Sequence, residues 1–305
     1  MSKLFSPLQL GGIEIANRVT ISPMCQYSAR DGTANDWHLQ HLMSLSLSGA
    51  GLLTLEATHV TPQGRITHGC AGLWSDENER ALQHIVTACR SVSPIKLGIQ
   101  LAHAGRKGSA QRPWEGRNAL PPGDGAWQTV APSAIALGSG WHTPQALDRA
   151  GMLAVRDAFA ASAGRALAVG FDLIELHSAH GYLLNEFLSP LANRREDDYG
   201  GSLANRMRFP LEVFEAVRAV WPASRALGAR IPGSDYVEGG WEPADAAAYA
   251  RALKERGCDF VTVSGGGVVL DAKVPVSPGY QVPFAETVKR EVGVTTGAAG
   301  LITTG

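Results

Sequence analysis

The chain has 305 residues, of which 45% are hydrophobic and 18% charged, and these figures exclude a disordered chain and allow one large core. Lysine and arginine (27) nearly balance aspartate and glutamate (28), so no basic field indicates binding to nucleic acid or to an anionic membrane. No uncharged apolar run reaches the roughly 18 residues typical of a membrane-spanning helix.

Seven short runs rich in Val, Ile, Leu and Thr are predicted to be buried parallel strands, with Ala-rich helices between them. The predicted strands are Val19–Ser22, Leu52–Glu56, Ile95–Leu101, Leu173–Leu176, Leu227–Ile231, Phe260–Ser264 and Val294–Ala298. The predicted helices are Asp76–Arg90, Gly151–Ala168, Asn205–Val220 and Pro243–Arg256. Gly170 and Gly257 follow two of these helices, where a left-handed C-cap favours glycine.

Strand–helix alternation predicts an α/β fold, and a TIM (β/α)8-type barrel fits better than an open doubly wound sheet. No Gly-x-Gly-x-x-Gly follows the first strand, and polar residues follow many strands. Residues 106–147, rich in Pro and Trp, are predicted to form a lid insertion over the barrel mouth, and residues 181–201 form a second insertion. We expect residues 1–305 to form a single domain.

The most informative cluster follows the fourth predicted strand, where His177, His180 and Tyr182 stand close together. Two imidazoles three residues apart can enter one pocket at the catalytic end of a barrel. Three interpretations stay open: two metal ligands, a pair of hydrogen-bond donors to a substrate oxygen, or a structural cap on the next helix.

These residues complete a resemblance that runs in order along essentially the whole chain. The sequence resembles the Old Yellow Enzyme family of flavin-dependent ene-reductases, in the branch that includes bacterial xenobiotic reductases. The matching stretches are Asn17–Arg18, Pro23–Tyr27, Asn35–His38, Gly98–Lys107, Ala131–Ala134, Glu175–Leu184, Asp198–Arg206, Ser234–Tyr236 and Thr296–Thr303. Each stretch alone is moderately specific, and their shared order makes a chance match very improbable.

The resemblance implies noncovalent FMN at the barrel mouth and a ping-pong cycle. In that cycle, hydride passes from NAD(P)H through the flavin to the β-carbon of an activated alkene, and a proton reaches the α-carbon. It also implies that His177 and His180 bind the carbonyl or nitro oxygen of the substrate, without a metal, and that Tyr182 is the general acid. The alternative for Tyr182 is aromatic packing beneath the lid.

Further roles come from the same resemblance. Cys25 tunes the flavin rather than acting as a nucleophile, or is only a small buried hydrophobe, and Tyr27 is a second substrate contact. Arg230 places a cation near flavin N1 and O2, or forms an internal salt bridge. The residues implied in cofactor binding are Ser22, Pro23, Met24, Cys25, Ala57, Gln100, Arg230 and Gly300. Trp37 and His38 are expected to shape the first loop, and no chemistry is assigned to Lys107.

The sequence departs from the family at its end. The family continues beyond Gly305 with an eighth βα unit that carries part of the FMN phosphate site, so we expect a barrel that lacks this unit. Truncation of a longer protein, supply of the unit by another chain, and a weakly flavin-binding fragment are the three options. The alternative function is therefore a truncated barrel that binds a ligand or partner without efficient turnover, and a metal-dependent hydrolase is a third hypothesis.

The resemblance, the composition and the cysteines also lead to expectations about partners and cellular compartment. We expect small activated alkenes as substrates, with no nucleic acid or membrane partner. We also expect a homo-oligomer, a dimer or tetramer, weakened if the last unit is absent. Four widely spaced cysteines and a start without the features of a signal peptide predict a reducing cytoplasm.

Overall fold

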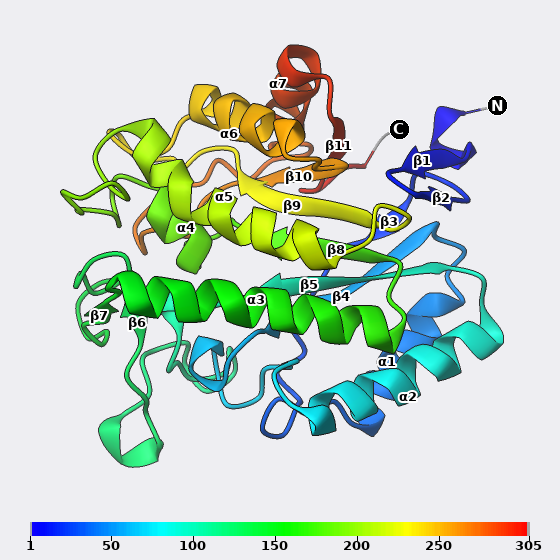
Figure 1. The fold of residues 1–305 in the computed structure, drawn as a ribbon, viewed down its shortest axis with the longest axis horizontal. Coiled ribbons are helices and arrows are strands. Elements are labelled where there is room, and N and C mark those ends of the chain that lie inside the picture. The colour runs from blue at the N-terminus through cyan, green and yellow to red at the C-terminus, as the bar shows by residue number, and fades with distance from the viewer. Residues whose placement is uncertain (1, 304–305) are drawn as a thin grey trace.

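The computed structural model describes residues 2–303 and contains a curled, seven-stranded parallel sheet with helices along its outer side (Figure 1). Its strands lie next to one another in chain order, as in a barrel, whereas a doubly wound sheet reverses its order. The strands of this sheet are β3 (Thr20–Ile21), β4 (Leu52–His59), β5 (Lys96–Ala102), β8 (Leu173–His177), β9 (Ala226–Pro232), β10 (Phe260–Ser264) and β11 (Thr295–Ala298). All seven predicted strands are confirmed, with ends shifted by a few residues.

Helices connect the strands and cover them with their apolar faces. The helices are α1 (Asp36–Ser46), α2 (Asp76–Val92), α3 (Arg149–Val169), α4 (Leu183–Leu188), α5 (Leu203–Val220), α6 (Pro243–Glu255) and α7 (Val282–Val292). Gly170 caps α3 in the left-handed conformation and Gly257 adopts the same conformation after α6, as predicted. Among the described residues, we find no helix that is both long enough and apolar enough to cross a membrane.

A hairpin that the sequence patterns did not predict packs against the amino-terminal ends of the barrel strands. It consists of β1 (Leu8–Leu10) and β2 (Ile13–Ile15), joined by a glycine pair. Its apolar residues form a small core with Leu52, Leu173 and Phe260, at or next to the first residues of their strands. The hairpin therefore covers the end of the barrel opposite the predicted site.

The two edges of the sheet are β3 and β11, and within residues 2–303 no ladder joins them. A pocket of about 310 Å³ lies between these edges, and Thr54, Glu175 and Thr262 from the inner face of the sheet line part of it. The arrangement confirms a barrel-type α/β fold, while the missing eighth unit stays a prediction.

The 106–147 insertion is mostly irregular and lies at the carboxyl-terminal end of the strands (Figure 1). Its regular elements are a two-stranded parallel sheet, β6 (Val130–Ala131) with β7 (Gln145–Ala146), and the short 3₁₀ helix Pro122–Asp124. Other 3₁₀ helices are Lys3–Phe5, Pro62–Gly64 and Gly105–Lys107. This position agrees with an insertion beside the barrel mouth, and its action as a lid stays a prediction.

Candidate active site

His177 ends β8 and is only 3% exposed. Its Nδ1 accepts the backbone N–H of Ala179 over 3.3 Å, which assigns the ring proton to Nε2. Burial lowers the pKa of His177 well below its usual value, and repulsion from His180, were it protonated, and from Arg230 lowers it further. The ring is therefore neutral at pH 7 and carries one N–H donor, on Nε2.

His180 occupies a left-handed backbone conformation (φ 59°), which is uncommon outside glycine and concentrated at functional sites. Its Nε2 lies 2.7 Å from Ser264 Oγ, and Arg230 Nη2 donates to the same oxygen over 3.3 Å. Because the hydroxyl oxygen accepts from the guanidinium, its own proton is available to His180 Nε2. Burial, aided by Arg230 and Lys107, lowers the pKa of His180, so its remaining donor is Nδ1–H.

Tyr182 stands beside this pair. The ring centroids of His177 and His180 are 5.0 Å apart, and those of His177 and Tyr182 are 4.8 Å apart, both edge-to-face. Burial raises the pKa of Tyr182 well above its usual value, so the phenol keeps its proton. Two imidazole N–H donors and one phenol O–H therefore meet at the end of β8.

Lys107 supports this cluster from the 106–147 insertion. Its Nζ donates to the carbonyl oxygens of His180 (2.8 Å) and Gly267 (2.9 Å) and lies 5.1 Å from the Tyr182 ring centroid. Burial lowers the pKa of Lys107 to about 8. The ammonium group thus holds the strained turn at His180 and places positive charge over the phenol ring.

Cys25 and Tyr27 approach from the loop after β3. Both pack, together with Tyr182, against a small buried cluster that contains Cys70. Burial raises the pKa of Cys25, and the negative charge of Glu56 raises it further, so the thiol is protonated. A protonated thiol is suited to weak hydrogen bonding rather than to nucleophilic attack.

Arg230 lies on β9 between the strands that carry the histidines and Ser264. Among residues 2–303 it makes no ion pair, and its buried Nε has no hydrogen-bond partner. The predicted alternative of an internal salt bridge is therefore not seen. An unpaired guanidinium fits an anionic group from outside the chain, and the pyrimidine edge of a reduced flavin carries such a charge.

Gln100 is held from one side. Its Nε2 donates to Glu175 Oε1 over 2.7 Å, and Thr262 Oγ1 donates to the other oxygen of Glu175 over 2.6 Å. Glu175 therefore fixes the orientation of the Gln100 amide, which suits recognition of a heterocycle edge by a donor and an acceptor.

The other predicted cofactor contacts are spread around this end of the barrel. Ser22 and Pro23 line the pocket between β3 and β11, whereas Met24 is 50% exposed. Ala57 is buried in β4. Gly300 follows β11, where its carbonyl accepts the N–H of Gly279 over 3.0 Å.

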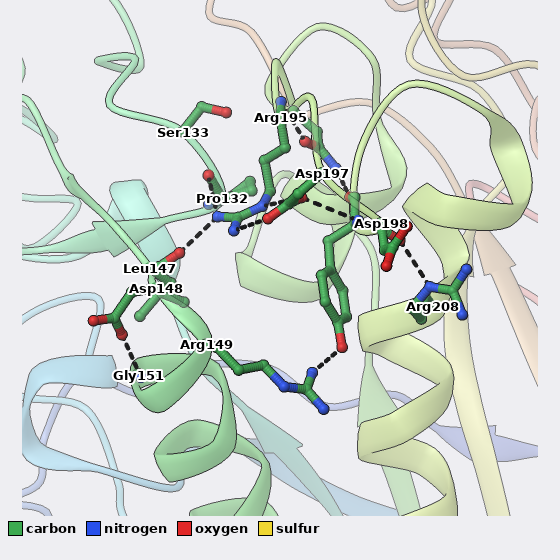
Figure 2. A network of polar contacts seen from close by, with 12 residues as sticks. Pro132, Ser133, Leu147, Asp148, Arg149, Gly151, Arg195, Asp197, Asp198 and Arg208 are labelled. Carbon is green, nitrogen blue, oxygen red and sulfur yellow. Dashed lines mark hydrogen bonds and ion pairs between the residues drawn. The ribbon is translucent and has the colours of Figure 1, made fainter.

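The two insertions are fastened to each other through Arg195 (Figure 2). Its Nη1 donates to the carbonyl oxygens of Pro132 (3.0 Å) and Leu147 (2.6 Å), and its Nη2 pairs with Asp197 at 2.5 Å. Arg194 adds a backbone N–H bond to Ser133 Oγ over 2.9 Å. The second insertion thereby binds the 106–147 insertion at Pro132–Ser133 and at Leu147.

Sequence reasoning assigned no role to Ser264, Glu175 or Lys107. Ser264 is the polar last residue of a predicted strand, which was an available signal. Glu175 gave a weaker signal, as a charged residue within an apolar run.

Within residues 2–303, no three His, Cys, Asp or Glu side chains gather in a way that could hold a metal ion.

Comparison with known proteins shows close similarity along the whole chain. Residues 3–305 match the NADH:flavin oxidoreductase / NADH oxidase family. An NADPH dehydrogenase from a Geobacillus species is 46% identical over 304 residues, covering 99% of this chain and 84% of the relative. An NADPH dehydrogenase from Listeria welshimeri is 43% identical over 307 residues, covering 100% of this chain and 85% of the relative.

Solved structures give a consistent result. Morphinone reductase in complex with tetrahydroNAD is 28% identical, with a TM-score of 0.81, and the match covers 98% of this chain and 81% of that chain. An old yellow enzyme homologue from Zymomonas mobilis has a TM-score of 0.81 at 23% identity, covering 98% of this chain and 82% of that chain. At that identity, the second likeness supports the fold alone.

Proposed function

The chain belongs to the NADH:flavin oxidoreductase / NADH oxidase family, and from this premise we propose that it reduces the C=C bond of small α,β-unsaturated carbonyl or nitro compounds. It is an NAD(P)H-dependent flavin oxidoreductase, with FMN as cofactor and NAD(P)H as reductant. When bound, FMN supplies the hydride that reaches the β-carbon of the alkene.

The observation that carries the proposal is the pair of neutral N–H donors on His177 and His180, whose rings are 5.0 Å apart. Addition of hydride to the β-carbon moves negative charge onto the carbonyl or nitro oxygen. Donors fixed at that oxygen bind the charged transition state more tightly than the neutral substrate. Because both imidazoles stay neutral, each offers one N–H, and the backbone of Ala179 and the hydroxyl of Ser264 fix which nitrogen carries it.

Tyr182 is the proposed proton donor to the α-carbon. Its phenol stands next to His177, and its high pKa keeps the proton available at neutral pH. Tyr27, which packs with Tyr182 around the same buried cluster, is the proposed second substrate contact. Cys25, with its protonated thiol, is the proposed modulator of the cofactor.

Seven other residues are proposed to hold FMN. The unpaired guanidinium of Arg230 fits the electron-rich pyrimidine edge, and Gln100, oriented by Glu175, fits the donor–acceptor pattern of that edge. The remaining contacts are proposed at Ser22, Pro23, Met24, Ala57 and Gly300. The 106–147 insertion is the proposed lid, and we expect a homo-oligomer working in the cytoplasm.

An absorption experiment tests this function directly. The purified protein, saturated with FMN, should bleach in the flavin band on anaerobic addition of NADPH. The band should recover on addition of cyclohexenone, with formation of one cyclohexanone per NADPH. Bleaching without recovery by any activated enone or nitroalkene would leave a flavin reductase and remove the proposed alkene chemistry.

A further inference from the structure

Strand β4 contains a bulge beside the candidate site. Its pairing with β5 shifts between Leu55 and Ala57, so Glu56 is the extra residue. A bulge changes the direction of a side chain and is often found next to an active site. Glu56 is only 7% exposed, although a carboxylate is rarely buried without partners. The buried carboxylate of Glu56 therefore needs polar partners inside the protein.

The carboxylate binds the loop after β3. Glu56 Oε2 accepts the backbone N–H of Gln26 over 3.0 Å. Gln26 lies between Cys25 and Tyr27, the two predicted site residues of this loop. Tyr27 has a left-handed backbone (φ 52°), a conformation that costs free energy and persists only where neighbouring contacts enforce it. The bond from Glu56 is one of those contacts.

His38 lies next to the carboxylate of Glu56. Its Nε2 lies 3.4 Å from Glu56 Oε1, and both side chains are buried. His38 Nδ1 accepts the backbone N–H of Asn35 over 3.2 Å at the start of α1, which leaves the ring proton on Nε2, although Nε2 makes no hydrogen bond within the described residues. Each carboxylate oxygen of Glu56 therefore has a nitrogen neighbour.

Helix α1 holds the same loop at a second point. Trp37 Nε1 donates to Gln26 Oε1 over 3.2 Å, and Gln26 Nε2 donates to the carbonyl oxygen of Met24 over 2.8 Å. Unlike Glu56, Trp37 is 53% exposed and uncharged, so it contributes geometry without buried charge. The two anchors can thus be tested separately.

We propose that Glu56 is a positioning residue, which fixes the Ser22–Tyr27 loop, and with it Cys25, through its hydrogen bond from the backbone N–H of Gln26. Tyr27 and Tyr182 pack with Cys25 around the cluster that contains Cys70. Burial is the largest cause of the raised pKa of the Cys25 thiol, and the negative charge of Glu56 raises it further. The carboxylate therefore adds to the effect of burial on the Cys25 thiol, and it holds the loop that carries this thiol. The link to alkene reduction rests on the proposed function, whereas the effect on the thiol does not.

Substitution of Glu56 by glutamine separates charge from geometry. Glu56→Gln keeps an oxygen for the Gln26 N–H and removes the charge, so the pKa of Cys25 should fall. Alkylation of Cys25 by iodoacetamide in the FMN-bound protein, followed by mass spectrometry over a range of pH, should then be about tenfold faster near neutral pH. Glu77→Gln removes an exposed carboxylate from α2 and should leave this rate unchanged.

Two more variants extend the test, and the first of them is measured without the thiol assay. Glu56→Ala also removes the hydrogen bond, and FMN should dissociate about tenfold faster than from Glu56→Gln, by a loss of about 1.4 kcal/mol. Trp37→Phe should raise Cys25 alkylation at every pH without moving its pKa. An unchanged Cys25 pKa in Glu56→Gln, together with equal FMN release from all variants, overturns the proposal.

The outcomes also separate this inference from the proposed function. A shifted thiol pKa in a protein that reduces no activated alkene keeps the role of Glu56 and removes the alkene chemistry. The opposite outcome is normal cyclohexenone reduction in the wild type and no difference between the wild type, Glu56→Gln and Glu56→Ala in any readout. That outcome keeps the alkene chemistry and removes the role of Glu56.

Discussion

The ring Nε2 of His180 lies 2.7 Å from the hydroxyl oxygen of Ser264, although the two residues are 84 positions apart in the chain. Arg230, on the strand between them, donates to the same hydroxyl over 3.3 Å. One hydroxyl therefore connects the ends of β8, β9 and β10 and fixes the tautomer of His180. The donor proposed to bind substrate depends on a residue that does not contact the substrate in this scheme.

Ser264→Ala should weaken binding at the substrate oxygen, although the variant keeps both His177 and His180. His180 would lose the hydrogen bond that selects its tautomer, and we expect phenol binding to weaken about tenfold, the effect of about 1.4 kcal/mol. Spectral titration of the FMN-bound protein with a phenol measures this affinity. Ser264→Thr keeps the hydroxyl and should bind nearly as tightly as the wild type, and an equal loss in both variants would contradict the tautomer argument.

Tyr182→Phe should slow one half-reaction and leave the other unchanged. Without the phenol proton, alkene reduction should slow by about 10²–10⁴-fold, while flavin reduction by NADPH stays within about twofold of the wild type. Anaerobic stopped-flow measurements follow each half-reaction by flavin absorbance. Tyr199→Phe, which removes a hydroxyl bonded to Glu212 of α5 rather than to the His177 cluster, should change neither rate. Equal slowing of both half-reactions would assign Tyr182 to cofactor or nucleotide binding instead.

Buried histidines should make the protein sensitive to acid. Burial lowers the pKa of His59 to about 3, and neither of its ring nitrogens has a partner among the described residues. The unfolded chain takes up a proton near pH 6.5 and the native protein does not, so this stabilisation is complete above about pH 6.5 and is lost as the pH falls toward 3. In His59→Leu, the free energy of unfolding should fall less steeply with decreasing pH. The slope should become shallower by up to about 1.4 kcal/mol per pH unit, which corresponds to one proton.

Denaturant unfolding of the FMN-saturated protein between about pH 7 and pH 5 measures that slope. His59→Leu should unfold at neutral pH with a free energy equal to or above that of the wild type, because it removes an unpartnered polar group from the interior. His84→Gln, at an exposed position of α2, serves as the control and should keep the wild-type slope. An unchanged acid slope in His59→Leu would show that His59 does not cause this loss of stability.

Arg195→Gln should loosen the 106–147 insertion. The change removes donors from the carbonyl oxygens of Pro132 and Leu147 and breaks the pair with Asp197. We expect amide hydrogen exchange around β6 and β7 to become about tenfold faster or more, since charged hydrogen bonds contribute roughly 1.5–3 kcal/mol. Arg194→Gln changes the neighbouring exposed arginine and should leave exchange unaltered; a change confined to residues 193–197 would contradict the coupling.

The strands of the barrel were predictable because each is a buried apolar run, and the predicted runs match β4, β8 and β10 closely. The hairpin of β1 and β2 was not predicted, since three-residue strands are too short to show alternation, although Gly11 and Gly12 form a typical turn signal. Length of the apolar run thus decided which strands the sequence revealed.

The candidate site was predictable where its residues follow one another along the chain. His177, His180 and Tyr182 belong to one strand end, so a local pattern exposes them together. Ser264 and Glu56 act through contacts with residues 84 and 30 positions away, and only the curled sheet brings these pairs together. Residues that orient other residues leave no local pattern, and this is why they were missed.

The single guanidinium of Arg195 has a consequence for evolution and engineering of substrate range. Because it binds two carbonyl oxygens of one insertion from within the other, neither segment is an independent module. A graft that replaces residues 106–147 with a relative's loop must reproduce carbonyl positions that residues 193–197 recognise. Transplants should therefore succeed when both segments come from the same donor, and sequence drift in one should be constrained by the other.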